Sequence, residues 1–158
     1  MGGIIIGYFG IGKSTLCKRR KDFIDLESSC FYYPDKSHIK LIDWYVGYTN
    51  IAMDLAKQGY YVFTSCHYPV RYIFSQAKDI KSVVIMPSVE MRESWEQGLK
   101  KRYLNTRSDK DYKAWSHADR LEDDLKSARE MDIPLILLDE GYDLKEVVYD
   151  YFNLGGNK

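Results

Sequence analysis

The fold of this chain is decided by the stretch GIIIGYFGIGKST, which runs from Gly3 to Thr15. Its first residues are apolar at successive positions and include three consecutive isoleucines, a pattern typical of a strand that is covered on both faces. A glycine-rich turn follows at once, and a helix-forming segment begins at Lys13. The sequence therefore predicts a buried strand, a glycine loop and a helix in direct succession.

The segment from Gly7 to Ser14 fits the pattern G-x-x-x-x-G-K-[ST] in full, between a predicted strand and a predicted helix. Glycines allow backbone amides to turn inward around an anion, and the start of the helix adds further donors. In this pattern the lysine spans the β- and γ-phosphates of a nucleoside triphosphate, and the Ser14 hydroxyl ligates Mg²⁺. We expect ATP and Mg²⁺ to bind at the following residues: Gly7, Gly10, Ile11, Gly12, Lys13, Ser14 and Thr15.

Further apolar or β-branched runs predict four more strands, at Phe23–Leu26, Tyr60–Ser65, Ser82–Met86 and Leu135–Asp139. Helical patterns lie between and after them, at Lys13–Arg20, His38–Gln58, Val89–Asn105, Ala118–Met131 and Asp143–Phe152. In the second of these helices, Ile42, Tyr45, Thr49, Ala52 and Ala56 form the stripe expected to be buried. The alternation predicts an α/β protein: a three-layer α/β/α P-loop NTPase fold with a five-stranded parallel sheet and a small helical lid.

The length of 158 residues suits one compact domain, residues 1–158. Lys plus Arg and Asp plus Glu number 23 each, so the chain has no bulk charge to hold nucleic acid or an anionic membrane. The three cysteines show no zinc-binding spacing, which favours reduced thiols and a cytoplasmic location. We expect no signal peptide and no membrane partner, because no apolar run approaches the roughly 20 residues of a membrane span.

The order of these features resembles the nucleoside monophosphate kinase-like branch of P-loop proteins, which includes adenylate, shikimate and gluconate kinases. The resemblance covers nearly the whole chain, and the compact form and divergent motifs also fit a phage-type member. It implies an ATP-dependent kinase that transfers the γ-phosphoryl group to a small acceptor. A (deoxy)nucleoside monophosphate is the first candidate for that acceptor, and a hydroxylated small molecule is the second.

The second predicted strand ends in FIDLES, residues 23–28, which is similar to the acidic strand end of those small-molecule kinases. The resemblance implies that Asp25 lies near Mg²⁺ and the acceptor, and that Glu27 holds substrate. An acid at the carboxyl end of a strand can also orient or deprotonate an acceptor oxygen. The third strand ends near His67 and Arg71, which we expect to face the same crevice, with Arg71 holding an acceptor phosphate.

The segment at about residues 90–117 is rich in basic residues, and the resemblance implies that it is a lid that closes over the phosphates. Arg92 and Arg102 are the better candidates for the cations that neutralise charge during transfer. The alternative is a solvated basic face that is balanced by the nearby glutamates Glu90, Glu93 and Glu96.

Two other enzymatic functions stay open, and so does a non-enzymatic nucleotide-binding module, if Asp25 and the lid arginines lie far from the phosphates. The segment LILLDE, residues 135–140, is similar to the motif in which ATPases place acids beside Mg²⁺ and water, so Asp139 and Glu140 could serve hydrolysis. Only one predicted helix follows it, which argues against this function; in a kinase-like domain the Glu140–Tyr142 loop would lie beside adenine. The 14 tyrosines and 3 tryptophans allow a kinase acting on a polynucleotide end or a DNA base, although the neutral net charge disfavours strand binding.

Overall fold

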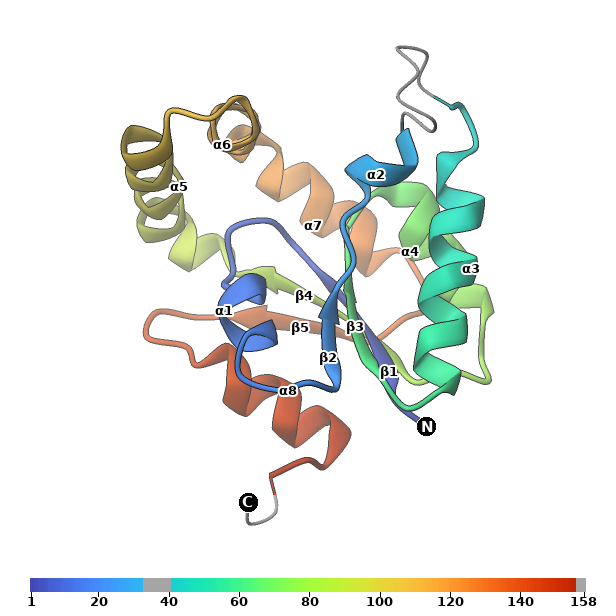
Figure 1. Ribbon diagram of the computed structural model, residues 1–158. Coiled ribbons are helices and arrows are strands. Elements are labelled where there is room, and N and C mark those ends of the chain that lie inside the picture. Colours follow the sequence, from blue (N-terminus) through green and yellow to red (C-terminus); the bar gives the residue numbers. More distant parts are fainter. Residues whose placement is uncertain (33–40, 156–158) are drawn as a thin grey trace.

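The computed structural model describes residues 1–32 and 41–155, and its centre is a parallel sheet with helices on both faces (Figure 1). The sheet has five strands in the order β2-β3-β1-β4-β5. The strands are β1 (Gly3–Gly7), β2 (Phe23–Asp25), β3 (Tyr61–Thr64), β4 (Ser82–Pro87) and β5 (Leu135–Leu138). All five predicted strands and the predicted α/β fold class are confirmed.

The first strand lies in the middle of the sheet, where its apolar run is completely buried. It pairs with β3, with Ile6 opposite Thr64, and with β4, with Gly7 opposite Ile85. On the outer side of β3, Asp25 lies opposite Phe63. Because all pairs are parallel, the carboxyl ends of the strands meet at one edge of the sheet, which is where such folds bind ligands.

The helices are α1 (Lys13–Cys17), α2 (Ser29–Tyr32), α3 (Trp44–Lys57), α4 (Tyr68–Gln76), α5 (Arg92–Thr106), α6 (Asp109–Ser116), α7 (Leu121–Arg129) and α8 (Leu144–Phe152). Short 3₁₀ turns at Val89–Met91 and Ala118–Arg120 lead into α5 and α7. In Figure 1, α1 and α8 cover one face of the sheet and α3, α4 and α7 cover the other. Helices α5 and α6 lie outside these layers, beyond the carboxyl edge of the sheet.

Several helix boundaries differ from the prediction, and the differences at α1 and α3 affect residues near the site or in the predicted buried stripe. Helix α1 ends at Cys17 instead of Arg20, because a turn closed by the Arg20–Asp22 ion pair leads the chain into β2. Helix α3 begins at Trp44; the start predicted at residue 38 lies outside the described residues. Ile42 therefore precedes the helix and is 95% exposed, so its predicted place in the buried stripe is wrong.

The sequence did not predict helices α2, α4 and α6 as separate elements, although two of them carry start signals. A proline, Pro69, lies in the first turn of α4, where its fixed φ suits a helix. The side chain of Ser108 accepts a hydrogen bond from the Asp111 amide and caps α6.

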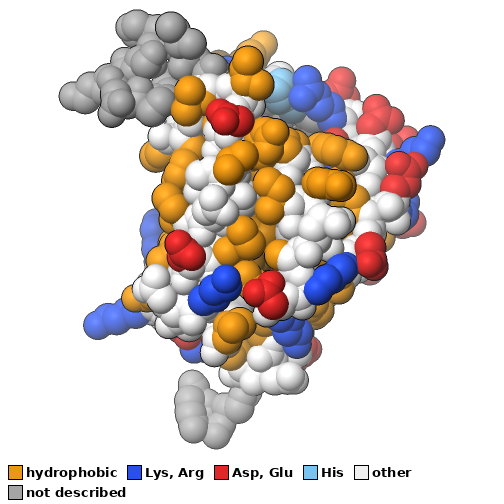
Figure 2. Space-filling model, turned by 90° about the vertical axis from the view of Figure 1, so that its right-hand side faces the viewer, with side chains coloured by type: hydrophobic (Ala, Val, Ile, Leu, Met, Phe, Trp, Pro, Cys, Tyr) orange, Lys and Arg blue, Asp and Glu red, His pale blue; other side chains and the backbone are white. Residues whose placement is uncertain are grey.

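Hydrophobic side chains also reach the surface along the α3 side of the molecule (Figure 2). On α3 itself, Val46 is 45% exposed and Ile51 is 43% exposed. In residues 1–32 and 41–155, no helix has the length and apolar character that crossing a membrane requires.

Candidate active site

The glycine loop between β1 and α1 has the backbone shape of a phosphate-binding loop. Gly10 and Gly12 have φ angles of 77° and 100°, a region that favours glycine. The ammonium group of Lys13 turns back over the loop and donates to the Gly7 carbonyl at 3.1 Å. Within the described part of the chain, the amides of residues 9–13 donate to no acceptor. The loop therefore presents a set of free amides beside a cation, which is the donor set that a triphosphate requires.

Two side chains from distant parts of the chain brace this loop. The Trp95 indole on α5 donates to the Phe9 carbonyl at 3.0 Å, and the Tyr142 hydroxyl donates to the Ile11 carbonyl at 2.9 Å. A Cβ atom added at Gly10 would lie 2.7 Å from Leu99 Cδ2, so α5 packs directly on the loop. These contacts hold two loop carbonyls outward, and the amides are left to point toward a ligand.

Lys13 and Asp25 form an electrostatically linked pair. Burial lowers the pKa of Lys13, while the negative charge of Asp25 opposes that shift. Burial likewise raises the pKa of Asp25, and the positive charge of Lys13 opposes this second shift. Burial therefore disfavours the charged form of each side chain, so a phosphate that approaches Lys13 would meet a cation that lacks its full hydration.

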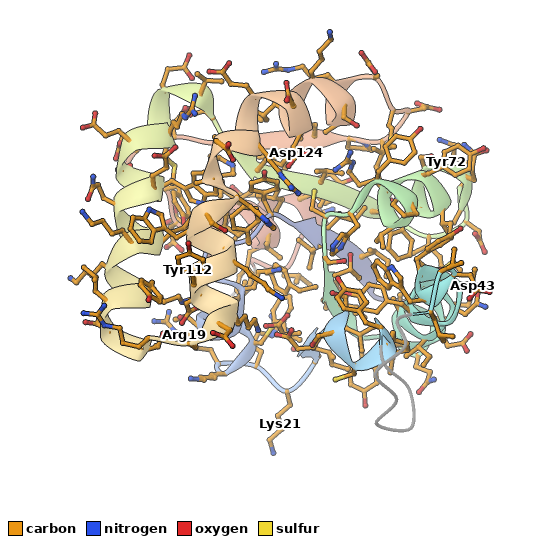
Figure 3. The ribbon with its side chains drawn as sticks, turned by 90° about the horizontal axis from the view of Figure 1, so that it is seen from above. Arg19, Lys21, Asp43, Tyr72, Tyr112 and Asp124 are labelled. Atoms are coloured by element: carbon orange, nitrogen blue, oxygen red, sulfur yellow. The ribbon has the colours of Figure 1, made fainter. Side chains whose placement is uncertain are left out.

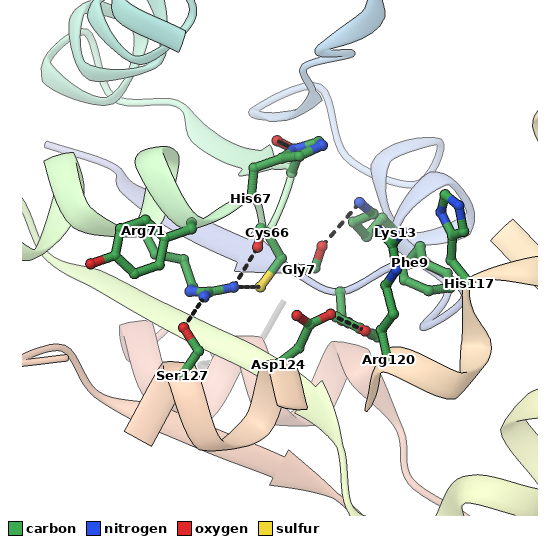
Figure 4. Close-up of a pocket in the computed structure, with 13 residues that line it drawn as sticks. Gly7, Phe9, Lys13, Cys66, His67, Arg71, His117, Arg120, Asp124 and Ser127 are labelled. Atoms are coloured by element: carbon green, nitrogen blue, oxygen red, sulfur yellow. Dashed lines mark hydrogen bonds between the residues drawn. The ribbon is translucent and has the colours of Figure 1, made fainter. Parts of the chain in front are cut away.

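A cavity of about 400 Å³ adjoins the loop (Figure 4). Its walls come from the loop, from the end of β3 and the start of α4, and from the segment that leads into α7. The lining residues are Gly7, Tyr8, Phe9, Lys13, Ser65, Cys66, His67, Tyr68, Arg71, His117, Arg120, Asp124 and Ser127. The structure thus brings four of the predicted site residues, Gly7, Lys13, His67 and Arg71, into one cavity.

Arg71 is both a wall of this cavity and a link between its two sides. Its side chain is almost fully buried; one terminal nitrogen donates to the Cys66 carbonyl at 2.6 Å and the other to Ser127 Oγ at 2.7 Å. Its Nε has no hydrogen-bond partner among residues 1–32 and 41–155. Burial raises the pKa of the Cys66 thiol, although the Arg71 charge opposes that shift. Arg71 thus joins α4 to α7 and keeps one unsatisfied donor.

His67 lies at the entrance to α4 and is held by polar and aromatic neighbours. Its Nδ1 lies 2.8 Å from Ser65 Oγ, and its Nε2 lies 3.1 Å from the Tyr32 hydroxyl. The ring of Trp44 packs edge-on against it, with 5.0 Å between ring centroids. The imidazole is therefore fixed in orientation at the cavity wall.

Sequence reasoning missed the wall formed by His117, Arg120, Asp124 and Ser127. The predicted helix at Ala118–Met131 does bury the apolar residues Ala118, Leu121, Leu125 and Ala128. The four missed residues repeat at intervals of three, four and three, next to those apolar residues. This spacing was the available signal, because it places polar side chains on one helix flank beside the buried face.

Asp124 also connects α7 to the glycine loop. Its carboxylate accepts a hydrogen bond from the hydroxyl of Tyr8, the second residue of the loop, and the Tyr8 side chain is buried. Burial and this hydrogen bond both raise the pKa of Tyr8, so the phenol stays protonated and continues to donate. In Figure 3, Asp124 lies on α7, while Tyr112 marks the α5–α6 side and Tyr72 the α3–α4 side of the molecule.

A second cavity, of about 290 Å³, lies against the same loop at Gly10. Its other lining residues come from the start of α5 and from the loop after β5: Met91, Ser94, Trp95, Gly98, Glu140, Gly141 and Tyr142. The Glu140 carboxylate accepts a hydrogen bond from Ser94 Oγ at 2.6 Å. Glu140 therefore lies at this second cavity and does not line the one that contains Lys13.

Four other predicted site residues lie outside the lining of the larger cavity. Asp25 is coupled to Lys13, as described above, and Glu27 pairs with Lys110 at 3.0 Å. Arg92 forms ion pairs with Glu96 and Glu122, at 3.1 Å and 3.0 Å. The Arg102 guanidinium lies 3.8 Å from Asp111. Both arginines are thus paired with acids of the α5–α7 region.

The remaining residues suit a magnesium ion that arrives with phosphates. Ser14 and Thr15 are in the first turn of α1, and Ser14 is partly exposed there. Within residues 1–32 and 41–155, no three His, Cys, Asp or Glu side chains form a metal-binding group. Mg²⁺ commonly takes one or two protein ligands together with substrate phosphates and water. The Ser14 hydroxyl and the Asp25 carboxylate are ligand types that suit that mode of binding.

Neither a protein-family model nor a curated protein sequence matches this chain. Among solved structures, it is similar to an uncharacterized protein from Eubacterium ventriosum ATCC 27560, with a TM-score of 0.51 and 13% identity over 97% of both chains. It is also similar to a shikimate kinase from Bacteroides thetaiotaomicron, with a TM-score of 0.46 and 17% identity, covering 96% of this chain and 93% of that one. At such low identity the likeness concerns the fold alone, which is the α/β fold with a parallel sheet described above.

Proposed function

We propose that this protein is an ATP- and Mg²⁺-dependent phosphotransferase that moves the γ-phosphoryl group of ATP to a small anionic acceptor. The observation that carries the proposal is that two cavities have the phosphate loop as a common wall. A hydrolase needs only water as its second substrate, whereas a kinase needs a separate acceptor site beside the terminal phosphate. The second cavity suits the base of the nucleotide, and the larger one suits the acceptor.

The larger cavity has the size and chemistry expected for a small acceptor. Its volume of about 400 Å³ lies in the usual range for small-molecule sites. Arg120 lines it and forms no ion pair with a described residue, and Arg71 and His117 add further donors. A nucleoside monophosphate is our first candidate, since its phosphate would meet these donors and its base could pack against Phe9 or Tyr68.

In this proposal the chain acts by positioning and by electrostatics. Lys13 and the loop amides hold the donor phosphates, and Ser14 with Asp25 would hold Mg²⁺, which neutralises the charge of the phosphates when bound. Arg71 and Arg120 hold the acceptor in line. Positioned donors in a site that excludes water stabilise developing charge without reorganisation during the reaction.

The location of Glu140 argues against the ATPase alternative. A hydrolytic glutamate must lie beside the terminal phosphate, but Glu140 lines the cavity at Gly10 and is held there by Ser94. We therefore place the Glu140–Tyr142 loop at the nucleotide base.

The test is a screen of the common nucleoside monophosphates and their deoxy forms with γ-labelled ATP. We expect label to pass to one acceptor class; free phosphate alone would identify an ATPase and contradict the proposal. With the best acceptor, Arg120→Gln should raise its KM about 10-fold or more while the affinity for ATP stays unchanged, because a charge-assisted hydrogen bond is lost. The matched control is Arg129→Gln, which removes an exposed arginine at the end of α7, the helix that follows Arg120; Arg129 does not line the cavity.

A further inference from the structure

The lid segment touches the opposite side of the active site at one point. Lys110 is in the first turn of α6, and its Nζ lies 3.0 Å from Oε1 of Glu27, 83 residues away in the sequence. Glu27 follows β2 by two residues. In Figure 1, α6 and the segment between β2 and α2 lie across from each other beyond the carboxyl edge of the sheet. This ion pair therefore spans the site from the lid to the strand that carries Asp25.

The charge of Lys110 reaches the centre of the site. Burial is the main cause of the lowered pKa of Lys13, and the positive charge of Lys110 lowers it further. Burial raises the pKa of Asp25, whereas the positive charges of Lys13 and Lys110 lower it. Lys110 thus lies close enough to both residues to influence their ionisation.

The two arginines favoured by the sequence lie elsewhere. Arg92 is at the base of α5, where its two ion pairs include one to Glu122 on α7. Arg102 faces Asp111, so its partner belongs to the lid itself. Neither arginine is among the charges that shift the pKa of Lys13 or of Asp25, whereas Lys110 acts on both.

We propose that Lys110 is the lid residue that contacts the terminal phosphate of the bound nucleotide, and that Glu27 holds it beside the phosphate loop until the nucleotide binds. This inference rests on the proposed function, because it assigns a role to the lid at the same site. Lys110 would turn from the Glu27 carboxylate to the phosphate oxygens when the nucleotide binds. A flexible four-carbon side chain suits such a change of partner.

The energetics favour this change of partner. The Lys110 side chain is 76% exposed and that of Glu27 is 46% exposed. Exposed ion pairs of this kind contribute little to stability, so the pair is easily opened. A terminal phosphate offers more charge and several acceptor oxygens, and hydrogen bonds between ionised groups are among the strongest in proteins. Glu27 remains solvated after Lys110 leaves, which keeps the cost of separation low.

The test measures nucleotide binding, so that it does not depend on finding the acceptor. Calorimetric titration of the full chain with Mg²⁺ and a non-hydrolysable ATP analogue should show that Lys110→Gln weakens binding about 10-fold. Lys113→Gln is the matched control, because Lys113 is an exposed residue of the same helix with no ion pair to a described residue. It should bind with unchanged affinity.

Glu27→Gln provides the second arm of the experiment. It frees Lys110, so we expect binding to tighten by up to about 5-fold, the equivalent of an exposed ion pair. The gain should vanish in the Glu27→Gln, Lys110→Gln double variant. Unchanged binding by Lys110→Gln, or a gain that persists in the double variant, would overturn the inference.

The outcomes also separate this inference from the proposed function. If the analogue binds with the expected pattern but no acceptor receives phosphate, the kinase proposal fails and the role of Lys110 in phosphate binding stands. If transfer occurs and Lys110→Gln binds and reacts like the original chain, the kinase proposal stands and the role of Lys110 is refuted. Failure of the unaltered chain to bind the analogue would refute both.

Discussion

At the scale of single residues, Lys13 and Asp25 carry an electrostatic cost of burial before any ligand binds. Burial acts against the charged form of both side chains, and each partly offsets the cost for the other. Groups arranged in this way favour ligand binding at the expense of stability, because a bound phosphate and metal would supply the missing interactions.

This arrangement predicts opposite effects of Asp25→Asn on stability and on catalysis. The pKa of Asp25 is raised by burial, so its contribution to stability is greatest at acidic pH and is lost as pH rises through its pKa in the folded protein. Asparagine stays neutral throughout. The variant should therefore have a higher Tm than the original chain at about pH 7, and the difference should shrink toward about pH 4.

Phosphoryl transfer by the same variant should fall about 100-fold or more, while ATP affinity changes little. Thermal unfolding at several pH values and steady-state kinetics provide the two measurements. A variant that is less stable than the original chain at neutral pH would show that the attraction between Asp25 and Lys13 outweighs the cost of burial.

At the scale of elements, the phosphate loop depends on contacts from two separate parts of the chain. Helix α5 supplies Trp95, and the loop before α8 supplies Tyr142. Since these contacts hold the carbonyls of Phe9 and Ile11, they fix the directions of the neighbouring peptide groups. The position of α5 is thereby coupled to the shape of the phosphate site.

Tyr142→Phe tests this coupling with the loss of a single hydroxyl. We expect the free energy of unfolding to fall by about 1 kcal/mol and nucleotide affinity to fall severalfold, because the Ile11 carbonyl loses its donor. Tyr72→Phe is the control, since Tyr72 is 52% exposed on α4, away from the loop. Chemical denaturation and calorimetric titration measure the two effects. Equal behaviour of the two variants would mean that the hydroxyl does not brace the loop.

At the scale of the whole molecule, Arg71 connects parts that are distant in the sequence. Its hydrogen bonds join the end of β3, at Cys66, to α7, at Ser127. These two segments form opposite walls of the larger cavity. The width of this cavity is therefore set by one buried guanidinium as well as by the packing of apolar side chains.

Arg71→Met should consequently destabilise the fold by about 3 kcal/mol, because it leaves buried polar partners unsatisfied. Ser127→Ala removes only one acceptor and should cost about 1 kcal/mol. Chemical denaturation gives both values. A loss of acceptor binding without loss of stability in Arg71→Met would show that Arg71 serves substrate alone.

The sequence by itself determined the strands, the α/β class and the phosphate loop, because each depends on local pattern. Successive apolar residues mark strands that are buried on both faces, and Gly10 and Gly12 of GYFGIGKS have φ angles that other residues disfavour. These constraints act within about a dozen neighbouring residues, so they can be read without knowledge of the rest of the chain.

Only the tertiary structure decided which side chains meet at the loop. Strand order places the end of β3 beside β1, and the packing of α4 and α7 brings Arg71, Arg120 and Asp124 to one cavity. The same is true of Lys110 and Glu27, whose contact depends on where α6 lies. Contacts of this kind are set by long-range packing, which the spacing of charges along the sequence does not reveal. The basic character of the segment at residues 90–117 was therefore readable from the sequence, but the pairing of Lys110 with Glu27 was not.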